Sequence, residues 1–164
     1  MKKRREMLVF LAVFTLLAVP AVVLAMSHGK MPATEGKALY EYITKTSPYQ
    51  QWSLWPGKEK LYPGTEPHGA LLTTYVNKPA LKGIKEQEGK LADGAIIVKE
   101  NYMPDKMLAA VTVMYKKSGY NPQAGDYFWL KFTPDGKIEA EGNVEMCIGC
   151  HRAAQKGDFL FTND

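Results

Sequence analysis

The hydrophobic pattern divides the chain into an apolar leader, one early helix and a series of strands. An uncharged apolar run extends from Met7 to Ala25. From Thr34 to Thr46, apolar and aromatic side chains recur at helical spacing, and Thr34 is the candidate N-cap. The pattern therefore predicts one amphipathic helix close behind the leader.

After residue 69 the pattern is typical of strands. Five segments combine β-branched, aromatic and aliphatic residues, and turn residues separate them: Ala70 to Val76, Ala95 to Tyr102, Leu108 to Tyr115, Asp126 to Thr133 and Lys137 to Ala140. Pro134-Asp135-Gly136 predicts a hairpin turn before the last of them. One helical turn is expected over Asn77 to Ile84, and a further helix near the carboxyl end. This order predicts an α+β fold with an antiparallel β-sheet.

Charge separates the leader from the rest of the chain. The formal net charge is +4, and Lys2, Lys3, Arg4 and Arg5 against Glu6 supply +3 of it. From Met26 onward 17 basic residues face 16 acidic ones, since the leader takes four of the 21 and one of the 17. No basic patch remains that would indicate binding to nucleic acid.

Residues 1–25 have the pattern of a signal peptide. A basic cluster precedes the apolar run, and Val23-Leu24-Ala25 ends it with small residues suited to cleavage before Met26. The run is also long enough to cross a bilayer, so an uncleaved anchor that tethers the protein to the membrane is the alternative. Either way the chain is expected in the periplasm, with a linker and helix at 26–50 and the functional domain at 51–164.

The run Cys147-Ile148-Gly149-Cys150-His151 carries the clearest chemistry. A C-x-x-C-H sequence is the attachment signature of a c-type haem. Two thiols form thioethers with the porphyrin vinyl groups, and the imidazole binds one axial face of the iron. Residues three and four apart share one face of a helix, so the three side chains can reach one porphyrin. One covalently attached haem c is therefore expected, with Cys147 and Cys150 as attachment points and His151 as metal ligand.

Three other interpretations fit the motif less well. A zinc site usually needs four ligands, whereas the chain has two cysteines, and His28 and His68 lie far away in sequence. A thioredoxin-like motif opens the helix of a βαβ unit, for which too little chain follows. A simple disulfide leaves the adjacent histidine unexplained.

Several segments together resemble the cytochrome P-460 superfamily, which includes the β-sheet cytochromes c′. They are Trp55-Pro56-Gly57, Pro67-His68-Gly69, Tyr75-Val76-Asn77, Asp93 to Glu100, Gly125 to Trp129 and the terminal C-x-x-C-H. The resemblance covers about Gln51 to Phe161. It implies a five-stranded antiparallel sheet with flanking helices, a homodimer, and His151 as proximal ligand of an iron whose other face is open or weakly occupied.

The resemblance also sets out the functional alternatives. The P-460 branch implies redox chemistry on hydroxylamine or nitric oxide, which requires a redox partner protein. The cytochrome c′ branch implies non-enzymatic binding of small gases. A six-coordinate electron carrier, with both axial positions of the iron filled, is the remaining alternative.

Lys99 and Glu100 are the candidate catalytic residues. Members of the P-460 branch carry a covalent link between a lysine and the haem, and Lys99 is the candidate for it here; a surface lysine paired with an acidic neighbour is the alternative. Alternation along a strand directs Ile97, Lys99 and Asn101 to one face and Glu100 to the other. Glu100 is the nearest acid and could relay a proton, but only one of the two should touch the haem.

His68 and the loop that contains it leave two further questions open. His68 could be a sixth iron ligand, but between Pro67 and Gly69 we favour a turn residue whose side chain hydrogen-bonds nearby backbone. Four methionines are also candidate axial ligands of the iron: Met103, Met107, Met114 and Met146. The loop from Gln51 to His68, rich in Trp, Pro and Gly, is expected to be ordered, either covering the haem or simply packing.

Overall fold

A computed structural model describes residues 30–87 and 89–161. The helices and strands of the described residues all belong to one compact unit, Met31–Asp164. The signal peptide, the alternative anchor and the first residues of the linker lie outside the described residues. Within the described ranges, none of the helices is both long enough and apolar enough to span a bilayer.

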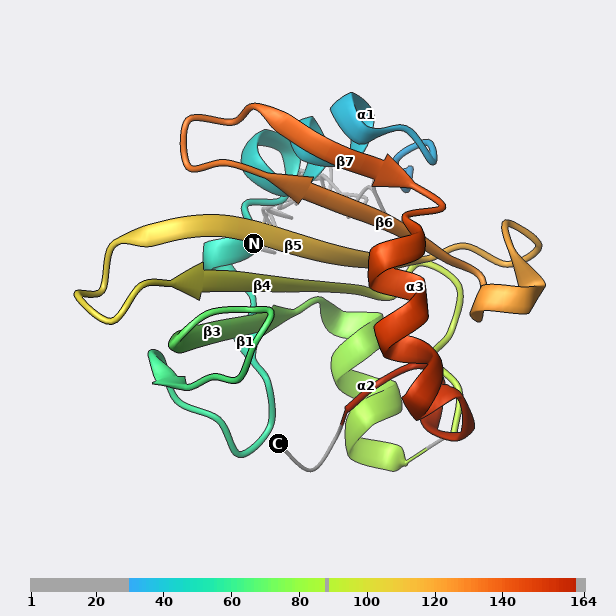
Figure 1. Cartoon of the computed structure of the whole chain (residues 1–164). Coiled ribbons are helices and arrows are strands. Elements are labelled where there is room, and N and C mark those ends of the chain that lie inside the picture. The colour runs from blue at the N-terminus through green and yellow to red at the C-terminus, as the bar shows by residue number, and fades with distance from the viewer. Residues whose placement is uncertain (1–29, 88, 162–164) are drawn as a thin grey trace, which may run out of the picture. The chain divides into compact units, whose positions relative to one another are not determined.

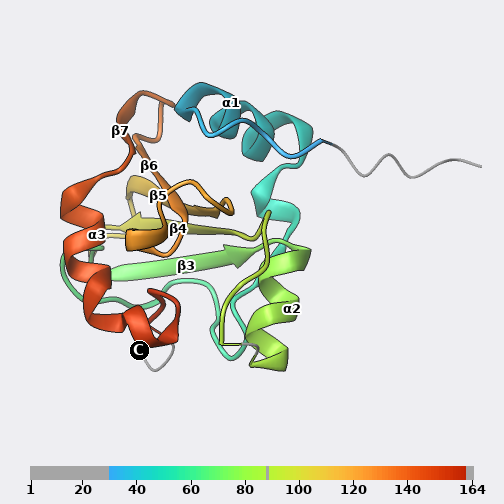
Figure 2. The ribbon, with the colours of Figure 1, turned by 90° about the vertical axis from the view of Figure 1, so that its right-hand side faces the viewer.

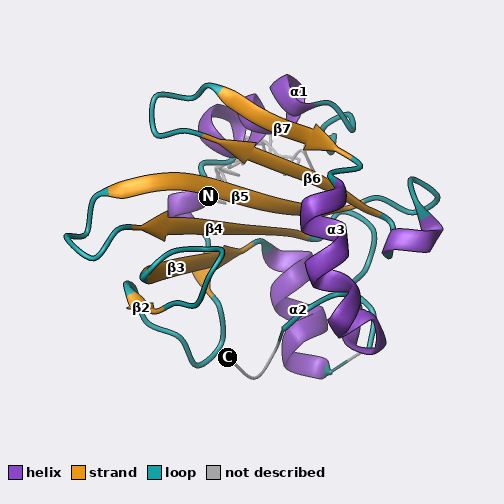
Figure 3. Cartoon of the chain, in the orientation of Figure 1, coloured by secondary structure: helices purple, strands orange, loops and turns teal. Residues whose placement is uncertain are grey.

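Five long strands form an antiparallel meander in sequence order (Figure 1). They are β3 (Leu71–Val76), β4 (Ile96–Tyr102), β5 (Leu108–Lys116), β6 (Tyr127–Phe132) and β7 (Ile138–Gly142). Two short strands, β1 (Ser53–Leu54) and β2 (Tyr62–Pro63), also pair with β3, which makes a seven-stranded sheet. The expected α+β class and antiparallel sheet are thus confirmed (Figure 3).

The two short strands lie in the segment that the sequence indicated would be irregular. Pro63 is tolerated in β2 because this strand lies at the margin of the sheet, where a missing backbone donor costs little. Trp55 N donates to Thr74 O at 2.9 Å, which fixes the loop to β3 directly after β1. The loop is therefore held along the sheet edge.

In the described part of the chain, three α-helices and several short helical turns accompany the sheet. The α-helices are α1 (Gly36–Glu41), α2 (Lys78–Glu86) and α3 (Glu145–His151). A π-helical turn, Tyr42–Thr46, continues α1, and 3-10 turns occur at Tyr49–Gln51, Pro122–Ala124 and Arg152–Gly157. Figure 2 shows α1 beside β7, away from α2 and α3.

Two helix predictions need correction. Thr34 is not the N-cap: Glu35 occupies that position, without a side-chain cap, and α1 begins at the buried Gly36. The segment after Asn77 is a nine-residue helix rather than one turn. The Asn77 side chain accepts hydrogen bonds from Ala80 N at 3.1 Å and Ile96 N at 2.9 Å, so it caps α2 and ties it to β4.

The sheet separates two hydrophobic clusters. One contains Ile96 and Val98 of β4 together with Leu39 and Ile43 from the first helical segment. The other contains Ile97 of β4 with residues of α2, α3 and the C-terminal segment. Successive side chains of β4 thus enter opposite layers, as the alternation predicted. The layer that holds α3 is the one in which the candidate site lies.

Candidate haem-binding site

Helix α3 presents the three residues of the attachment motif. Cys147 is half-buried, Cys150 is exposed, and both are free thiols. Burial, reinforced by the neighbouring Cys150, raises the pKa of Cys147. His151, the last residue of α3, is buried. The helix therefore brings two thiols and one imidazole to a single side of the molecule.

The hydrogen bond of His151 fixes the state of its ring. Nδ1 lies 2.7 Å from the carbonyl oxygen of Phe159, which can only accept, so Nδ1 carries the proton. The lone pair is then on Nε2, the arrangement that a metal-binding imidazole needs. Burial lowers the pKa of His151; the bond to Phe159 opposes this effect, and the charge of Lys99 adds to it. The neutral ring is thus favoured.

Aromatic rings hold His151 on two sides. The ring centroids of Trp129 and His151 are 4.8 Å apart, and those of Phe161 and His151 are 5.3 Å apart. Both contacts are edge-on. No spacing in the sequence predicts that Trp129 belongs to the site, because its place beside His151 depends on how α3 packs on the sheet.

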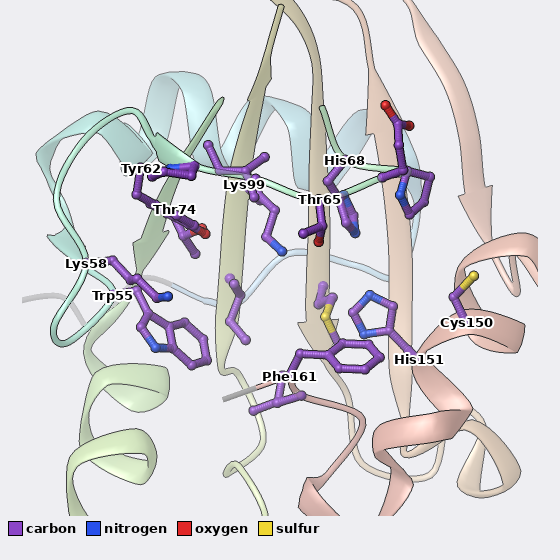
Figure 4. A pocket seen from close by; sticks show the side chains of 18 residues that line it. Trp55, Lys58, Tyr62, Thr65, His68, Thr74, Lys99, Cys150, His151 and Phe161 are labelled. Atoms are coloured by element: carbon purple, nitrogen blue, oxygen red, sulfur yellow. The ribbon is translucent and has the colours of Figure 1, made fainter. Parts of the chain in front are cut away.

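Two adjoining cavities, of about 430 and 120 Å³, lie between α3, the sheet and the Trp55–His68 loop. The larger is lined by Trp55, Tyr62 and the loop from Pro63 to His68 (Figure 4). Both cavities share a set of residues from four parts of the chain: Pro67, His68, Ile97, Lys99, Met114, Cys150 and His151. The tryptophan-rich loop therefore forms a wall of the site.

Lys99 lies in the wall of both cavities. It is half-buried in β4, between Thr74 of β3 and Thr112 of β5. Its charge lowers the pKa of both His68 and His151, after the larger effect of burial on each. The ammonium group is therefore close to both imidazoles, as Figure 4 shows for the side chain.

Glu100 lies on the other face of the sheet. It is buried and accepts hydrogen bonds from Tyr49 OH at 2.9 Å and Tyr102 OH at 2.7 Å. It does not line either cavity. The structure thus brings Lys99 to the motif and directs Glu100 into the core, the separation that strand alternation requires.

His68 has a partner that the sequence did not suggest. Its Nδ1 lies 3.1 Å from Oδ1 of Asn101, 33 residues away, rather than bonding to the backbone of its own turn. The Asn101 amide nitrogen donates to the carbonyls of Lys99 and Ala110, at 3.0 and 3.1 Å, which leaves Oδ1 as an acceptor. Nδ1 of His68 is therefore the donor.

His68 also faces His151. Their ring centroids are 6.1 Å apart, with the ring planes at 85°. Burial, followed by the charges of Lys99 and His151, lowers the pKa of His68 to about 4. Two neutral imidazoles thus border the same space from different elements (Figure 4).

The candidate methionines separate into two groups. Met114 lines both cavities, and Met146 lines the smaller one. Met103 and Met107 are exposed, and neither lines either of these two cavities.

The residues present fit a covalently attached haem. The site combines two free thiols, an imidazole with Nε2 available and a largely apolar cavity. One further observation agrees: among the described residues, Trp129 Nε1 is the buried side-chain nitrogen without a hydrogen-bond partner, and Trp129 lines the smaller cavity. Buried donors normally have partners, so this one is available to a group bound there.

Most of the chain matches a known protein family. The family model described as Cytochrome P460 matches residues 47–162, which include β1 to β7, α3 and the whole attachment motif. A search of curated proteins gave no match.

Proposed function

This chain belongs to the cytochrome P460 family, and from that premise we propose that it carries out redox chemistry on hydroxylamine or a related small nitrogen ligand. As a c-type cytochrome it would hold one haem through Cys147, Cys150 and His151. When bound, the haem would supply one-electron chemistry at its iron. The observation that carries the proposal is the cavity of about 430 Å³ that His151 and Lys99 both line.

The chain's own residues have distinct parts in this proposal. Each cysteine adds its S–H across a vinyl double bond, which forms one S–C and one C–H bond without any change in electron count. His151 supplies Nε2, and Phe159 O keeps the ring in the required tautomer. Trp55, Ile97 and Leu160 contribute apolar walls that exclude water.

Lys99 is our candidate for the lysine–haem link. It lies in the wall of both cavities, within electrostatic reach of His151. Replacing one amine N–H and one porphyrin C–H by an N–C bond releases two protons and two electrons, so the step needs a two-electron oxidant such as a peroxide. The linked protein would be lighter by two hydrogens than the same protein with thioethers alone.

A matched pair of lysine variants tests this link. Lys131 also lines the smaller cavity but forms an ion pair with Glu139 at 2.9 Å. The link should give the wild-type protein a strongly red-shifted Soret band in addition to the mass deficit. In Lys99→Ala we expect both to disappear, whereas Lys131→Ala should retain both. If the band survives in Lys99→Ala, the lysine assignment is wrong.

The proposed activity has a direct test. Oxidised, haem-loaded protein is mixed anaerobically with hydroxylamine and a one-electron acceptor dye that stands in for the redox partner protein. We expect catalytic reduction of the dye. Binding of nitric oxide or carbon monoxide without dye reduction would reject the enzymatic function in favour of gas binding.

The leader supports export. A basic cluster followed by an apolar run is the pattern of a signal peptide or N-terminal anchor, and haem c attachment occurs outside the cytoplasm. We therefore propose a periplasmic protein, and a homodimer as the family resemblance implies. Cell fractionation with an intact-mass measurement distinguishes a mature chain that begins at Met26 from an uncleaved, membrane-tethered one.

A further inference from the structure

We infer that His68 is the second axial ligand of the haem iron, so that the resting iron is held between His151 and His68. The inference rests on the proposed function only in requiring that haem is attached at α3. It specifies what occupies the distal position, and it makes that position a gate that a small ligand must open.

The spacing of the two rings matches a shared metal. Their centroids are 6.1 Å apart. A metal–imidazole bond is about 2.05 Å long, and a five-membered ring with bonds of about 1.35 Å has a radius of about 1.1 Å. Two imidazoles on opposite sides of one metal therefore have centroids about 6.3 Å apart. The observed separation differs from this value by only about 0.2 Å.

Both rings also leave the correct nitrogen available. Nδ1 of His151 donates to Phe159 O, and Nδ1 of His68 donates to Asn101 Oδ1. In each neutral ring the lone pair is then on Nε2. Within the described part of the chain, no hydrogen bond is formed by Nε2 of either ring. A metal-binding histidine usually has its other nitrogen held in this way.

The surroundings leave room for a flat group between the rings. The larger cavity extends from the two histidines toward Trp55, and the smaller one extends toward Trp129 and Cys147. Lys99 lies on the same face of β4 as Ile97 and Asn101, midway between them along the strand. A disc between the histidines would therefore reach into both cavities and have an edge near Lys99.

The position of His68 in the chain makes it replaceable. It lies in the loop between β2 and β3, whose residues Thr65, Glu66 and Pro67 are exposed. His151, in contrast, is buried at the end of α3. A loop ligand can move aside when a competing molecule binds the iron, while the proximal ligand stays in place.

Mass action predicts by how much His68 would weaken the binding of a competing ligand to the iron. If His68 occupies the iron in about 90–99% of molecules, a competing ligand binds about 10–100-fold more weakly than it would to an open iron. His68→Phe should therefore increase the apparent affinity of the ferrous protein for carbon monoxide by about 10–100-fold.

The experiment uses the haem-loaded protein and three spectroscopic measurements. Ultraviolet–visible absorption, low-temperature electron paramagnetic resonance and near-infrared magnetic circular dichroism are recorded for wild type, His68→Phe and Met114→Leu. We expect bis-histidine low-spin spectra in wild type and Met114→Leu, and a high-spin, five-coordinate spectrum in His68→Phe. Met114 is the matched control because it is the candidate methionine that lines both cavities.

The outcomes separate this inference from the proposed function. A high-spin wild type, a histidine–methionine signature, or an unchanged low-spin spectrum in His68→Phe would each overturn the inference. The wild-type spectra decide the matter even if His68→Phe does not fold. A wild-type protein without thioether-bound haem after maturation would instead reject the proposed function.

Discussion

Lys116 Nζ lies 2.6 Å from Asp158 Oδ1, in an ion pair whose side chains are only 8% and 4% exposed. The same ammonium donates to Gly125 O at 2.7 Å, and the other carboxylate oxygen accepts from Leu91 N at 2.8 Å and Tyr127 OH at 2.9 Å. The pair therefore attaches the C-terminal segment to the sheet. It does so one residue before Phe159, whose carbonyl oxygen accepts from Nδ1 of His151, so the pair supports the position of that carbonyl.

Replacing Lys116 by an uncharged residue should strongly lower the free energy of unfolding. In Lys116→Met, the buried carboxylate of Asp158 loses its counter-ion, and breaking a buried pair in this way costs about 3–5 kcal/mol. The neighbouring Lys117→Met is the control, because Lys117 pairs with Asp93 at 3.4 Å with side chains 44% and 46% exposed. That exposed pair should contribute less than about 1 kcal/mol. Urea unfolding measures both, and similar losses in the two variants would contradict the prediction.

Gly125 is expected to be sensitive because of its contact with Phe159. A Cβ at Gly125 would lie 2.5 Å from Phe159 Cδ2, and the residue has φ +68°. Gly119 has φ +78° with open space around it, so Gly119→Ala has only the left-handed backbone cost of about 1–2 kcal/mol. We expect Gly125→Ala to lose more stability and also to change the haem spectrum, since the carbonyl of Phe159 must move. Equal stability of the two variants, with identical spectra, would argue against this coupling.

The tyrosines around Glu100 predict alkaline sensitivity. Burial, followed by the charge of Glu100, raises the pKa of Tyr75 to about 12, and burial also raises the pKa of Tyr49 and Tyr102. Unfolded tyrosines lose their protons near pH 10. Above that pH the folded state binds more protons than the unfolded state, so the free energy of unfolding falls as the pH rises from about 10 toward 12.

Glu100→Gln tests the cause of that sensitivity. Without the negative charge, phenolate absorbance should develop at lower pH than in wild type. The haem spectrum should stay unchanged, because Glu100 faces away from both cavities. A changed haem spectrum with an unchanged tyrosine titration would restore Glu100 as a catalytic candidate.

The change in stability caused by substituting Trp129 should depend on whether haem is bound. Its buried Nε1–H has no partner among the described residues. In haem-free protein, Trp129→Phe removes an unsatisfied donor, which offsets part of the lost packing. If the bound group supplies an acceptor, the same substitution costs about 1 kcal/mol more in haem-loaded protein. Urea unfolding of the four species measures the difference, and an equal loss in both forms would show that Nε1 has no partner there.

The local features of this protein can be predicted from its sequence. The attachment motif is readable because Cys147, Cys150 and His151 occupy one turn of α3, and helical spacing alone brings them together. The five long strands followed from alternating or apolar segments between turn residues, and period-two alternation placed Lys99 and Glu100 on opposite faces.

The long-range partners that complete the site became evident from the packed fold. Alternation along β4 separates two faces but does not say which one meets α3, so the pocket-facing position of Lys99 required the packed fold. The contact of His151 with Phe159 O, eight residues along the chain, depends on the turn that follows α3. The contacts of His68 with Asn101 and His151 depend on a loop that packs against the sheet. Such contacts arise from packing between distant segments, which no spacing within one segment encodes.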